Sequence, residues 1–334
     1  MKGGRIYLIR YIIKRIIWII PVLLGVTIIV FTITYFTPGD PVKAILGSGF
    51  TPEQYAAKKH DLGLDVGYVQ QLARYIWRIF TQFNFGRSFQ TSIPIAVEIG
   101  HRVPVSAKLS ISALLLMVVI GLPLGMISAL KQYSALDASL TGIALFLAAI
   151  PGFVLALLAL VLFGVVLRWV PIAGISSWKG WILPIVCSAL GGIAVYLRMT
   201  RTTMLEVIRQ DYIRTARAKG QLEGVVIRKH ALKNCMIPLV TVFGGMLTMM
   251  FSGSIIIETI FGLPGMGMYM MTGITARDYP VINGTVLIIS FIICVINIIV
   301  DICYAFIDPR IRAQYQSKRQ EKAIVKLLRS GEEG

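Results

Sequence analysis

The chain has 334 residues, of which 56% are hydrophobic, and it carries a formal net charge of +17. Its mean hydropathy of +0.75 excludes an ordinary water-soluble domain, because such a domain must present a polar surface to water. Only 15% of the residues are charged, and they lie in clusters separated by long uncharged stretches. The positive charge is therefore read as a property of a membrane protein, with no nucleic-acid partner expected.

Six uncharged stretches predict an all-α, polytopic membrane protein with six transmembrane helices, since about 20 apolar residues cross a bilayer. In chain order they are Ile16–Phe36, Leu109–Leu130, Ala138–Leu167, Gly180–Leu197, Asn234–Ile257 and Tyr279–Val300. The first has an apolar core too long for a signal peptide and no small-residue cleavage site, so we expect a retained span. Pro151 lies inside the third and is expected to bend or break it, because proline removes an internal hydrogen bond.

Positive charge is unevenly distributed along this predicted topology. With a cytoplasmic N-terminus, the cytoplasmic segments contain 22 of the 33 Lys and Arg residues and the outer segments contain 11. Cytoplasmic loops are enriched in Lys and Arg, so both termini are predicted to face the cytoplasm. The predicted order is a cytoplasmic tail (1–15), the first span (16–36), an extracytoplasmic segment (37–108), a transmembrane core with the other five spans (109–311) and a cytoplasmic tail (312–334).

The extracytoplasmic segment is long for a plain loop, so we expect it to fold into short helices. One is predicted over Tyr68–Phe83, where apolar residues recur at helical spacing: Leu72, Tyr75, Ile76 and Ile79.

The second long segment outside the membrane, 198–233, lies on the predicted cytoplasmic side. Within it, apolar residues at helical spacing predict one helix over Met204–Gly220: Leu205, Ile208, Tyr212 and Ala216. Gly220 is expected to end this helix, because glycine readily adopts the left-handed conformation. A second short helix over about Glu223–Lys233 would complete a compact knob. Its small residues and arginines suit contact with another protein, but a basic helix lying on anionic lipid would show the same spacing.

Chemistry-bearing residues do not form a recognisable catalytic or metal-binding pattern. The four cysteines and three histidines are not at metal-ligand or redox spacing. The phosphate-binding pattern GxxxxGK[ST] is absent from the sequence. We therefore expect no metal, no cofactor and no ATP site in this chain, and no enzymatic activity of its own.

Polar residues inside predicted spans are candidates for a substrate path, because such residues tend to face a cavity or a neighbour. A single hydroxyl can instead bond to a carbonyl of its own helix. In addition, Glu258 and Asp278 bracket a glycine-rich stretch, Phe261–Gly267, which we hypothesise to enter the outer mouth of such a path. The residues proposed for the path and its outer gate are Ser252, Ser254, Glu258, Phe261, Pro264, Gly265 and Asn297.

Several motifs resemble one known family in the same order along the chain. Asp211–Gly220 reads DYIRTARAKG, and His230–Asn234 reads HALKN. The other matching motifs are Pro38–Pro41, Gly63–Asp65, Phe85–Phe89, Glu258–Gly267, Arg277–Pro280 and Asp308–Arg312. Together they resemble the permease subunits of ABC importers in the dipeptide, oligopeptide and nickel family. The loop departs from the general EAA-loop pattern of importers, with Arg214 in place of glutamate and Lys233 in place of proline.

This resemblance implies the fold of an ABC type I importer permease in the bacterial cytoplasmic membrane. The chain resembles the first permease of such a system, and its implied partners are a second homologous permease chain, two ABC ATPase subunits that carry ATP and Mg²⁺, an extracytoplasmic substrate-binding protein, a peptide substrate and membrane lipid. The loop 204–233 would couple the permease to the ATPases. The coupling residues implied are Asp211, Tyr212, Arg214, Thr215, Ala216, Arg217, Gly220 and His230.

Two alternatives remain open at this point. A permease for nickel or another metal chelate belongs to the same family. A secondary transporter would need an ionisable site at mid-membrane, and the centres of the six stretches contain no Asp, Glu, Lys, Arg or His.

Overall fold

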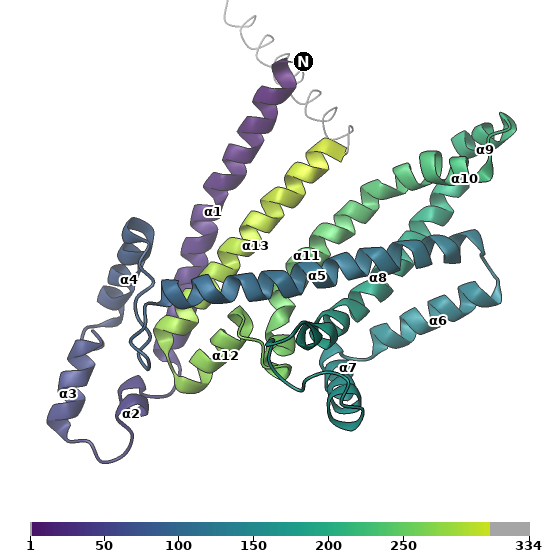
Figure 1. Cartoon of the computed structure of the whole chain (residues 1–334). Coiled ribbons are helices and arrows are strands. Elements are labelled where there is room, and N and C mark those ends of the chain that lie inside the picture. The colour runs from purple at the N-terminus through teal and green to yellow at the C-terminus, as the bar shows by residue number, and fades with distance from the viewer. Residues whose placement is uncertain (1, 308–334) are drawn as a thin grey trace, which may run out of the picture.

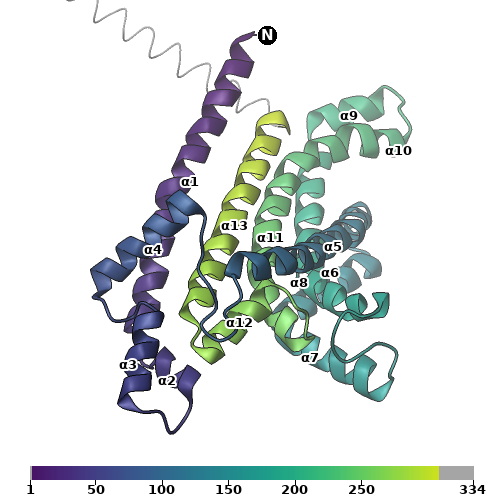
Figure 2. The same ribbon diagram turned by 60° about the vertical axis from the view of Figure 1, so that its left-hand side comes forward.

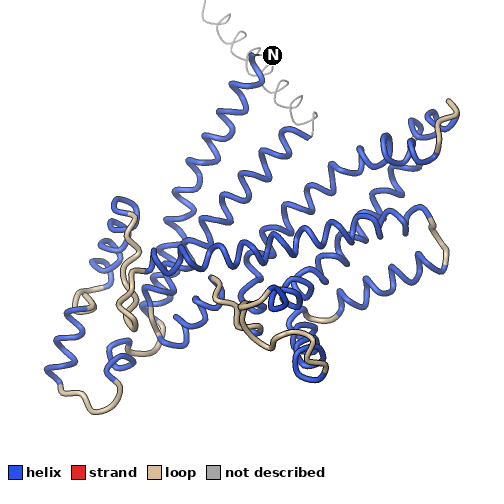
Figure 3. The backbone as a smooth tube through the Cα atoms, viewed as in Figure 1, coloured by secondary structure: helices blue, strands red, loops and turns tan. Residues whose placement is uncertain are grey.

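The computed structural model describes residues 2–307, and over this range the chain is almost entirely helical and has no strand (Figures 1 and 3). The predicted tail 312–334 and the motif Asp308–Arg312 lie outside the described residues. Five helical segments in the described range are long and apolar enough to cross a membrane: Ile12–Phe36, Ile95–Leu130, Trp178–Ile208, Glu223–Ser252 and Tyr279–Cys303. They belong to α1 (Lys2–Phe36), α5 (Ile95–Leu130), η2 (Trp178–Trp181) with α8 (Ile182–Ile208), α11 (Lys233–Ile260) with the short helices before it, and α13 (Tyr279–Ile307).

The predicted third span is broken. Helix α6 (Ala135–Ala149) is followed by α7 (Gly152–Ala159), which continues as the π-helical η1 (Leu160–Val166). The two halves meet at an angle of 96°, and Pro151 lies at the break between them. The break expected at this proline is confirmed, so the six predicted spans are observed as five helices and one sharply bent pair.

The predicted extracytoplasmic segment contains three short helices, as expected. They are α2 (Pro41–Leu46), α3 (Pro52–Asp61) and α4 (Tyr68–Gln82). The carboxylate of Asp40 accepts hydrogen bonds from the first backbone N–H groups of α2, and Thr51 with Gln54 forms a capping box on α3. Beyond them, α5 begins at Ile95, well before the predicted start of its span at Leu109.

Helices α5 and α8 pack closely through two glycines spaced four residues apart on α5. A Cβ atom at Gly125 would lie 2.6 Å from the carbonyl oxygen of Leu197, and one at Gly121 would lie 3.2 Å from that of Ile193. Small residues at i and i+4 let two helix backbones approach, which is how helices gain packing energy in lipid. The largest buried cluster surrounds this contact and includes Met117, Tyr196 and Leu239 of α11.

Hydrogen bonds and ion pairs connect α6 to α8 and α1 to α13. Arg201 of α8 donates two hydrogen bonds to Asp137 of α6, at 2.7 and 2.8 Å. At one end of α1, Arg15 forms an ion pair with Asp301 of α13 at 3.0 Å. Toward the other end, the hydroxyl of Thr34 donates to Asn283 of α13 at 3.1 Å. Helices α1 and α13 therefore form a paired arm beside the α5–α8 core (Figures 1 and 2).

The two ends of the molecule differ. The short helices after α8 project at the same end as the N-terminal end of α1 (Figures 1 and 2). Helices α2 and α3, from the segment predicted to be extracytoplasmic, lie at the opposite end, together with α12 (Met266–Ala276). This arrangement agrees with a topology in which 198–233 and the N-terminus share one side of the membrane.

We predict that Gly125→Val separates α5 from α8, because its side chain has no room at the helix contact. The cost of overpacking is about 1–3 kcal/mol, seen as a lower melting temperature of the purified chain in detergent. The control is Gly142→Val on α6, where a Cβ atom meets nothing within 4 Å. Equal melting temperatures for the two variants would contradict the proposed packing.

Candidate functional site

The knob predicted between the fourth and fifth spans is present. After α8 ends, the chain turns and forms α9 (Asp211–Ala218), then α10 (Glu223–Val225) and the π-helical η3 (Val226–Leu232), which runs directly into α11. Gly220 lies between α9 and α10 with φ of +72°, the left-handed conformation that was expected of it. The helix predicted over Met204–Gly220 is interrupted at Arg209 and Gln210, so α8 and α9 are separate helices.

The inner face of the knob is apolar. Ile213 of α9 is fully buried against a cluster that includes Val226 and Ala231 of η3. Ala216, one helical turn after Ile213, is also buried, with 6% of its surface exposed. Of the predicted stripe on α9, Ala216 is buried, whereas Tyr212 is 43% exposed and the neighbouring Ile213 occupies the buried position.

Burial also corrects the role expected of Ala216. This residue was expected to offer a small contact surface to a partner, but it packs inside the knob. It supports the shape of the surface and does not form it.

Two polar contacts connect the arms of the knob across the Gly220 turn. The guanidinium of Arg217 donates to both carboxylate oxygens of Glu223, at 3.1 and 2.6 Å. This hydrogen bonding raises the pKa of Arg217 above its ordinary value. His230 and Gln221 share a hydrogen bond of 2.9 Å between the ring nitrogen and the amide oxygen. Exposed ion pairs contribute little energy, about 0.5 kcal/mol, so the role of the Arg217 pair is to hold the geometry.

The outer surface of the knob combines charge with exposed apolar side chains. Asp211, Arg214 and Thr215 are exposed on α9, as predicted for a contact surface. Sequence reasoning missed Leu222, which is 78% exposed at the tip, and Val225, which is 42% exposed. A large apolar residue two positions after a turn glycine was the available signal. Exposed apolar residues clustered at such a tip are typical of a protein contact.

A second site lies at the opposite end of α11. The side chain of Glu258 is fully buried and accepts hydrogen bonds from the Ser106 hydroxyl at 2.6 Å and from the N–H of Gly267 at 2.7 Å. Ser106 in turn accepts a hydrogen bond from the N–H of Met266 at 2.8 Å. The carboxylate thus binds the start of α12, where helix N–H groups lack partners within the helix. A Cβ atom on Gly265 would lie 2.4 Å from this carboxylate, so only glycine fits there.

This geometry changes the interpretation of the predicted outer gate. Glu258, Phe261 and Gly265 are buried at the turn between α11 and α12 and expose no surface to a path. Ser254 is buried within α11, where its hydroxyl donates to the carbonyl of Phe251 at 3.1 Å. Pro264 alone of the gate residues in this turn is exposed. On the next turn, Asp278 is likewise buried and accepts hydrogen bonds from the Ser88 hydroxyl and from the N–H of Phe89 at 3.1 Å. It anchors the extracytoplasmic segment to the start of α13.

The other predicted path residues lie on an open face. Ser252 of α11 and Asn297 of α13 are exposed, and Asn297 accepts a hydrogen bond from Thr248 at 3.3 Å. On α11, the face that contains Ser252 also contains three small residues at helical spacing before it: Thr241, Gly245 and Thr248. It is a narrow polar strip on an otherwise apolar helix.

Comparison with known proteins agrees with this architecture. Residues 8–110 and 121–313 match the N-terminal and main parts of one family, described as the binding-protein-dependent transport system inner membrane component. The chain belongs to this family. It is therefore an inner-membrane component of a transport system, and the six-span importer permease fold expected from the motifs is confirmed in its family and helical architecture.

Relatives in this family align over nearly their whole length. A Brucella abortus (strain 2308) protein named as a peptide transport system permease is 41% identical over 309 residues, covering 90% of this chain and 98% of the relative. The dipeptide transport system permease DppB of Alkalihalophilus pseudofirmus is 38% identical, covering 91% and 100%. The glutathione transport system permease GsiC of Escherichia coli (strain K12) is 36% identical, covering 91% and 99%.

A solved structure shows the same fold. The inward-facing MetNI methionine ABC transporter contains a chain that superposes with a TM-score of 0.55 at 19% identity. The match covers 63% of this chain and 96% of that chain.

We predict that Glu258→Ala lowers the free energy of unfolding by about 3 kcal/mol, because the Ser106 hydroxyl and the N–H of Gly267 lose their buried acceptor. Thermal unfolding of the purified chain in detergent measures this loss. Glu258→Gln keeps one oxygen acceptor and should lose less. If Glu258→Ala instead melted like the unmodified chain and only transport fell, the side chain would be a gate and not a brace.

Proposed function

We propose that this chain is the permease subunit of an ATP-driven importer that moves peptides across the bacterial cytoplasmic membrane. The observation that carries the proposal is the knob, α9 to η3, which exposes a compact surface at one end of two adjoining helices. The cargo is inferred from the relatives, which are named for peptides, dipeptides and glutathione. Those names favour a peptide over the nickel chelate that the motifs alone left open.

The knob is connected directly to two membrane-spanning helices, α8 and α11. Helix α8 enters it through a two-residue turn, and η3 leaves it by continuing into α11 without a break. A push on the knob therefore acts on two membrane-spanning helices together. We infer that an ATPase subunit receives the exposed face formed by Tyr212, Leu222 and Val225, and that closure of the ATPase pair tilts α8 and α11 in a rigid-body change of access.

The proposed sidedness follows from the same geometry. The knob and the N-terminal end of α1 lie at one end of the molecule (Figures 1 and 2). The segments predicted on that side carry most of the Lys and Arg residues, so we assign this end to the cytoplasm. The opposite end, with α2 to α4 and α12, would then receive the extracytoplasmic binding protein.

The translocation path is proposed to run between this chain and a second, homologous permease. The exposed polar strip of α11, with Ser252, and Asn297 of α13 would line this chain's half of the path. Neutral hydroxyl and amide groups bind peptide backbones without selecting a charge, which suits a path whose specificity is set by a separate binding protein. ATP and Mg²⁺ would be bound by the two ATPase subunits, with no catalytic residue supplied by this chain.

We predict that Leu222→Asp reduces substrate uptake and transport-coupled ATP hydrolysis about tenfold or more, because a carboxylate is placed in the apolar contact with the ATPase. The assay uses the complete transporter reconstituted in vesicles with its binding protein. Tyr133→Asp is the control, since Tyr133 is 87% exposed in the turn between α5 and α6, outside the knob and outside the end proposed to receive the binding protein.

A second variant separates docking from folding of the knob. Ala216→Asp buries a carboxylate inside the knob and should make its loop sensitive to protease, whereas Leu222→Asp should leave it as resistant as the unmodified chain. Full coupled activity of a stably inserted Leu222→Asp transporter would rule out the knob as the ATPase contact.

A further inference from the structure

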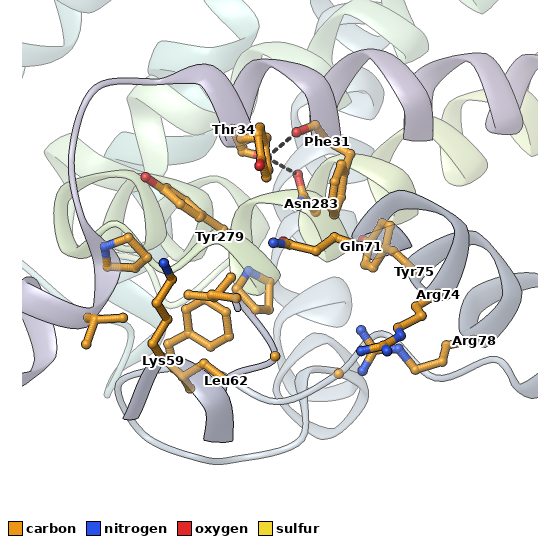
Figure 4. A pocket seen from close by; sticks show the side chains of 18 of the residues that line it. Phe31, Thr34, Lys59, Leu62, Gln71, Arg74, Tyr75, Arg78, Tyr279 and Asn283 are labelled. Atoms are coloured by element: carbon orange, nitrogen blue, oxygen red, sulfur yellow. Dashed lines mark hydrogen bonds between the residues drawn. The ribbon is translucent and has the colours of Figure 1, made fainter. Parts of the chain in front are cut away.

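A cavity of ≈ 590 Å³ lies between the ends of α1 and α13 and the helices α3 and α4 (Figure 4). Its membrane-side wall comes from Phe31, Thr34 and Tyr35 near the end of α1 and from Asn283 of α13. Helices α3 and α4 supply the opposite wall. The cavity lies away from the polar strip of α11 and from the knob, so neither the proposed path nor the proposed coupling uses it.

The wall formed by α3 and α4 is cationic. Arg74 and Arg78 lie one helical turn apart on α4, at one side of the cavity, and Lys59 of α3 lies at the opposite side (Figure 4). Within residues 2–307, no carboxylate oxygen lies within 4.0 Å of the charged nitrogens of these three side chains. Two like charges at i and i+4 destabilise a helix unless an anion lies between them. The pair therefore concentrates positive charge without a direct ion-pair partner, although the charge of Arg74 contributes to lowering the pKa of nearby Asp65.

The acidic groups close to this site are already engaged. Asp40 lines the cavity, but its carboxylate accepts hydrogen bonds from the Tyr55 hydroxyl at 2.7 Å and from the N–H of Val42 at 2.9 Å. The carboxylate of Asp65, whose pKa is lowered mainly by its hydrogen bond to His60, bonds to that ring at 2.6 Å. Neither is an ion-pair partner of Arg74 or Arg78.

The remaining lining is aromatic and apolar. Tyr75 of α4 packs against Phe31 of α1 with ring centroids 5.3 Å apart, and both line the cavity. Trp77, also on the lining, is 65% exposed. Phe36, the last residue of the first span, is 68% exposed and contacts Tyr35, which lines the cavity. Aromatic residues at the end of a span mark the boundary between hydrocarbon and headgroups, so the cavity is at headgroup level.

We propose that this cavity binds an anionic phospholipid of the outer leaflet, with its phosphate held by Arg74 and Arg78. Arginine presents a planar set of donors that binds phosphate oxygens in pairs. The acyl chains would follow the face of α1 that continues from Tyr35, where Ile28, two helical turns before it, is 38% exposed. A lipid fits this combination better than a soluble anion, because one end of the cavity is cationic and the other adjoins the lipid-facing surface of a span.

The test measures lipid retained by the complete transporter. The complex is reconstituted in nanodiscs of phosphatidylcholine with a minor fraction of phosphatidylglycerol, extracted in mild detergent and examined by native mass spectrometry. We expect the unmodified transporter to retain phosphatidylglycerol, and Arg74→Gln with Arg78→Gln to retain about tenfold less, because two charge-assisted hydrogen-bonding groups are removed. The matched control is Arg168→Gln with Lys179→Gln, two exposed cations outside the cavity lining.

A second measurement needs no variant. A photoreactive phosphatidylglycerol is cross-linked to the unmodified transporter, and the modified peptides are identified. Adducts in 59–78 or 31–35 would support the proposal. Equal retention by both double variants, adducts confined to other segments, or displacement of the lipid by a soluble acidic peptide at low concentration would overturn it.

Discussion

The close contact of α5 with α8 fixes the positions of the helices packed around it. In lipid there is no hydrophobic force between apolar helices, so they hold together through close packing and buried polar contacts. Gly121 and Gly125 allow that packing, and Arg201 adds its two hydrogen bonds to Asp137 of α6. Because α8 also packs against α7 and α11 and leads into the knob, its position sets the position of the proposed ATPase contact.

The end of the molecule with α2 and α12 is organised by a different device, which uses carboxylates: Glu258 and Asp278 are buried, and Asp40 is half-buried. Glu258, Asp278 and Asp40 each accept backbone N–H groups, and each fixes an irregular turn or the start of a helix. Buried carboxylates are costly unless fully hydrogen-bonded, which accounts for the number of donors around each one. The molecule thus combines a glycine-packed core with an opposite end that is held in shape by hydrogen bonds.

Much of this fold follows from local sequence. The length of the uncharged stretches predicts the spans, and Pro151 predicts the sharp bend in the third. Gly220, with its left-handed backbone, predicts the turn of the knob. Each of these depends on one residue type or on a run of apolar residues, so neighbours distant in sequence do not alter it. The helix over Tyr68–Gln82 is equally local, because its apolar face repeats at helical spacing.

The sequence-based predictions were wrong at positions whose burial or role is set by contacts with residues distant in the sequence. The predicted helix is interrupted at Gln210, and on α9 it is Ile213, not Tyr212, that packs with Ala216 against the apolar cluster inside the knob. Glu258 resembled a gate residue because it follows a span and precedes a glycine-rich turn. Its actual role depends on Ser106, which is 152 positions away in sequence, and no local pattern connects the two.

The central claim is that the tip of the knob docks into an ATPase subunit on the cytoplasmic side. The most direct measurement is the labelling rate of Leu222→Cys, in a chain whose native cysteines are replaced, with a membrane-impermeant maleimide in inside-out vesicles. We expect rapid labelling of the permease pair alone and strong protection once the ATPase subunits are bound. Equal labelling with and without the ATPases, or labelling only in right-side-out vesicles, would contradict it.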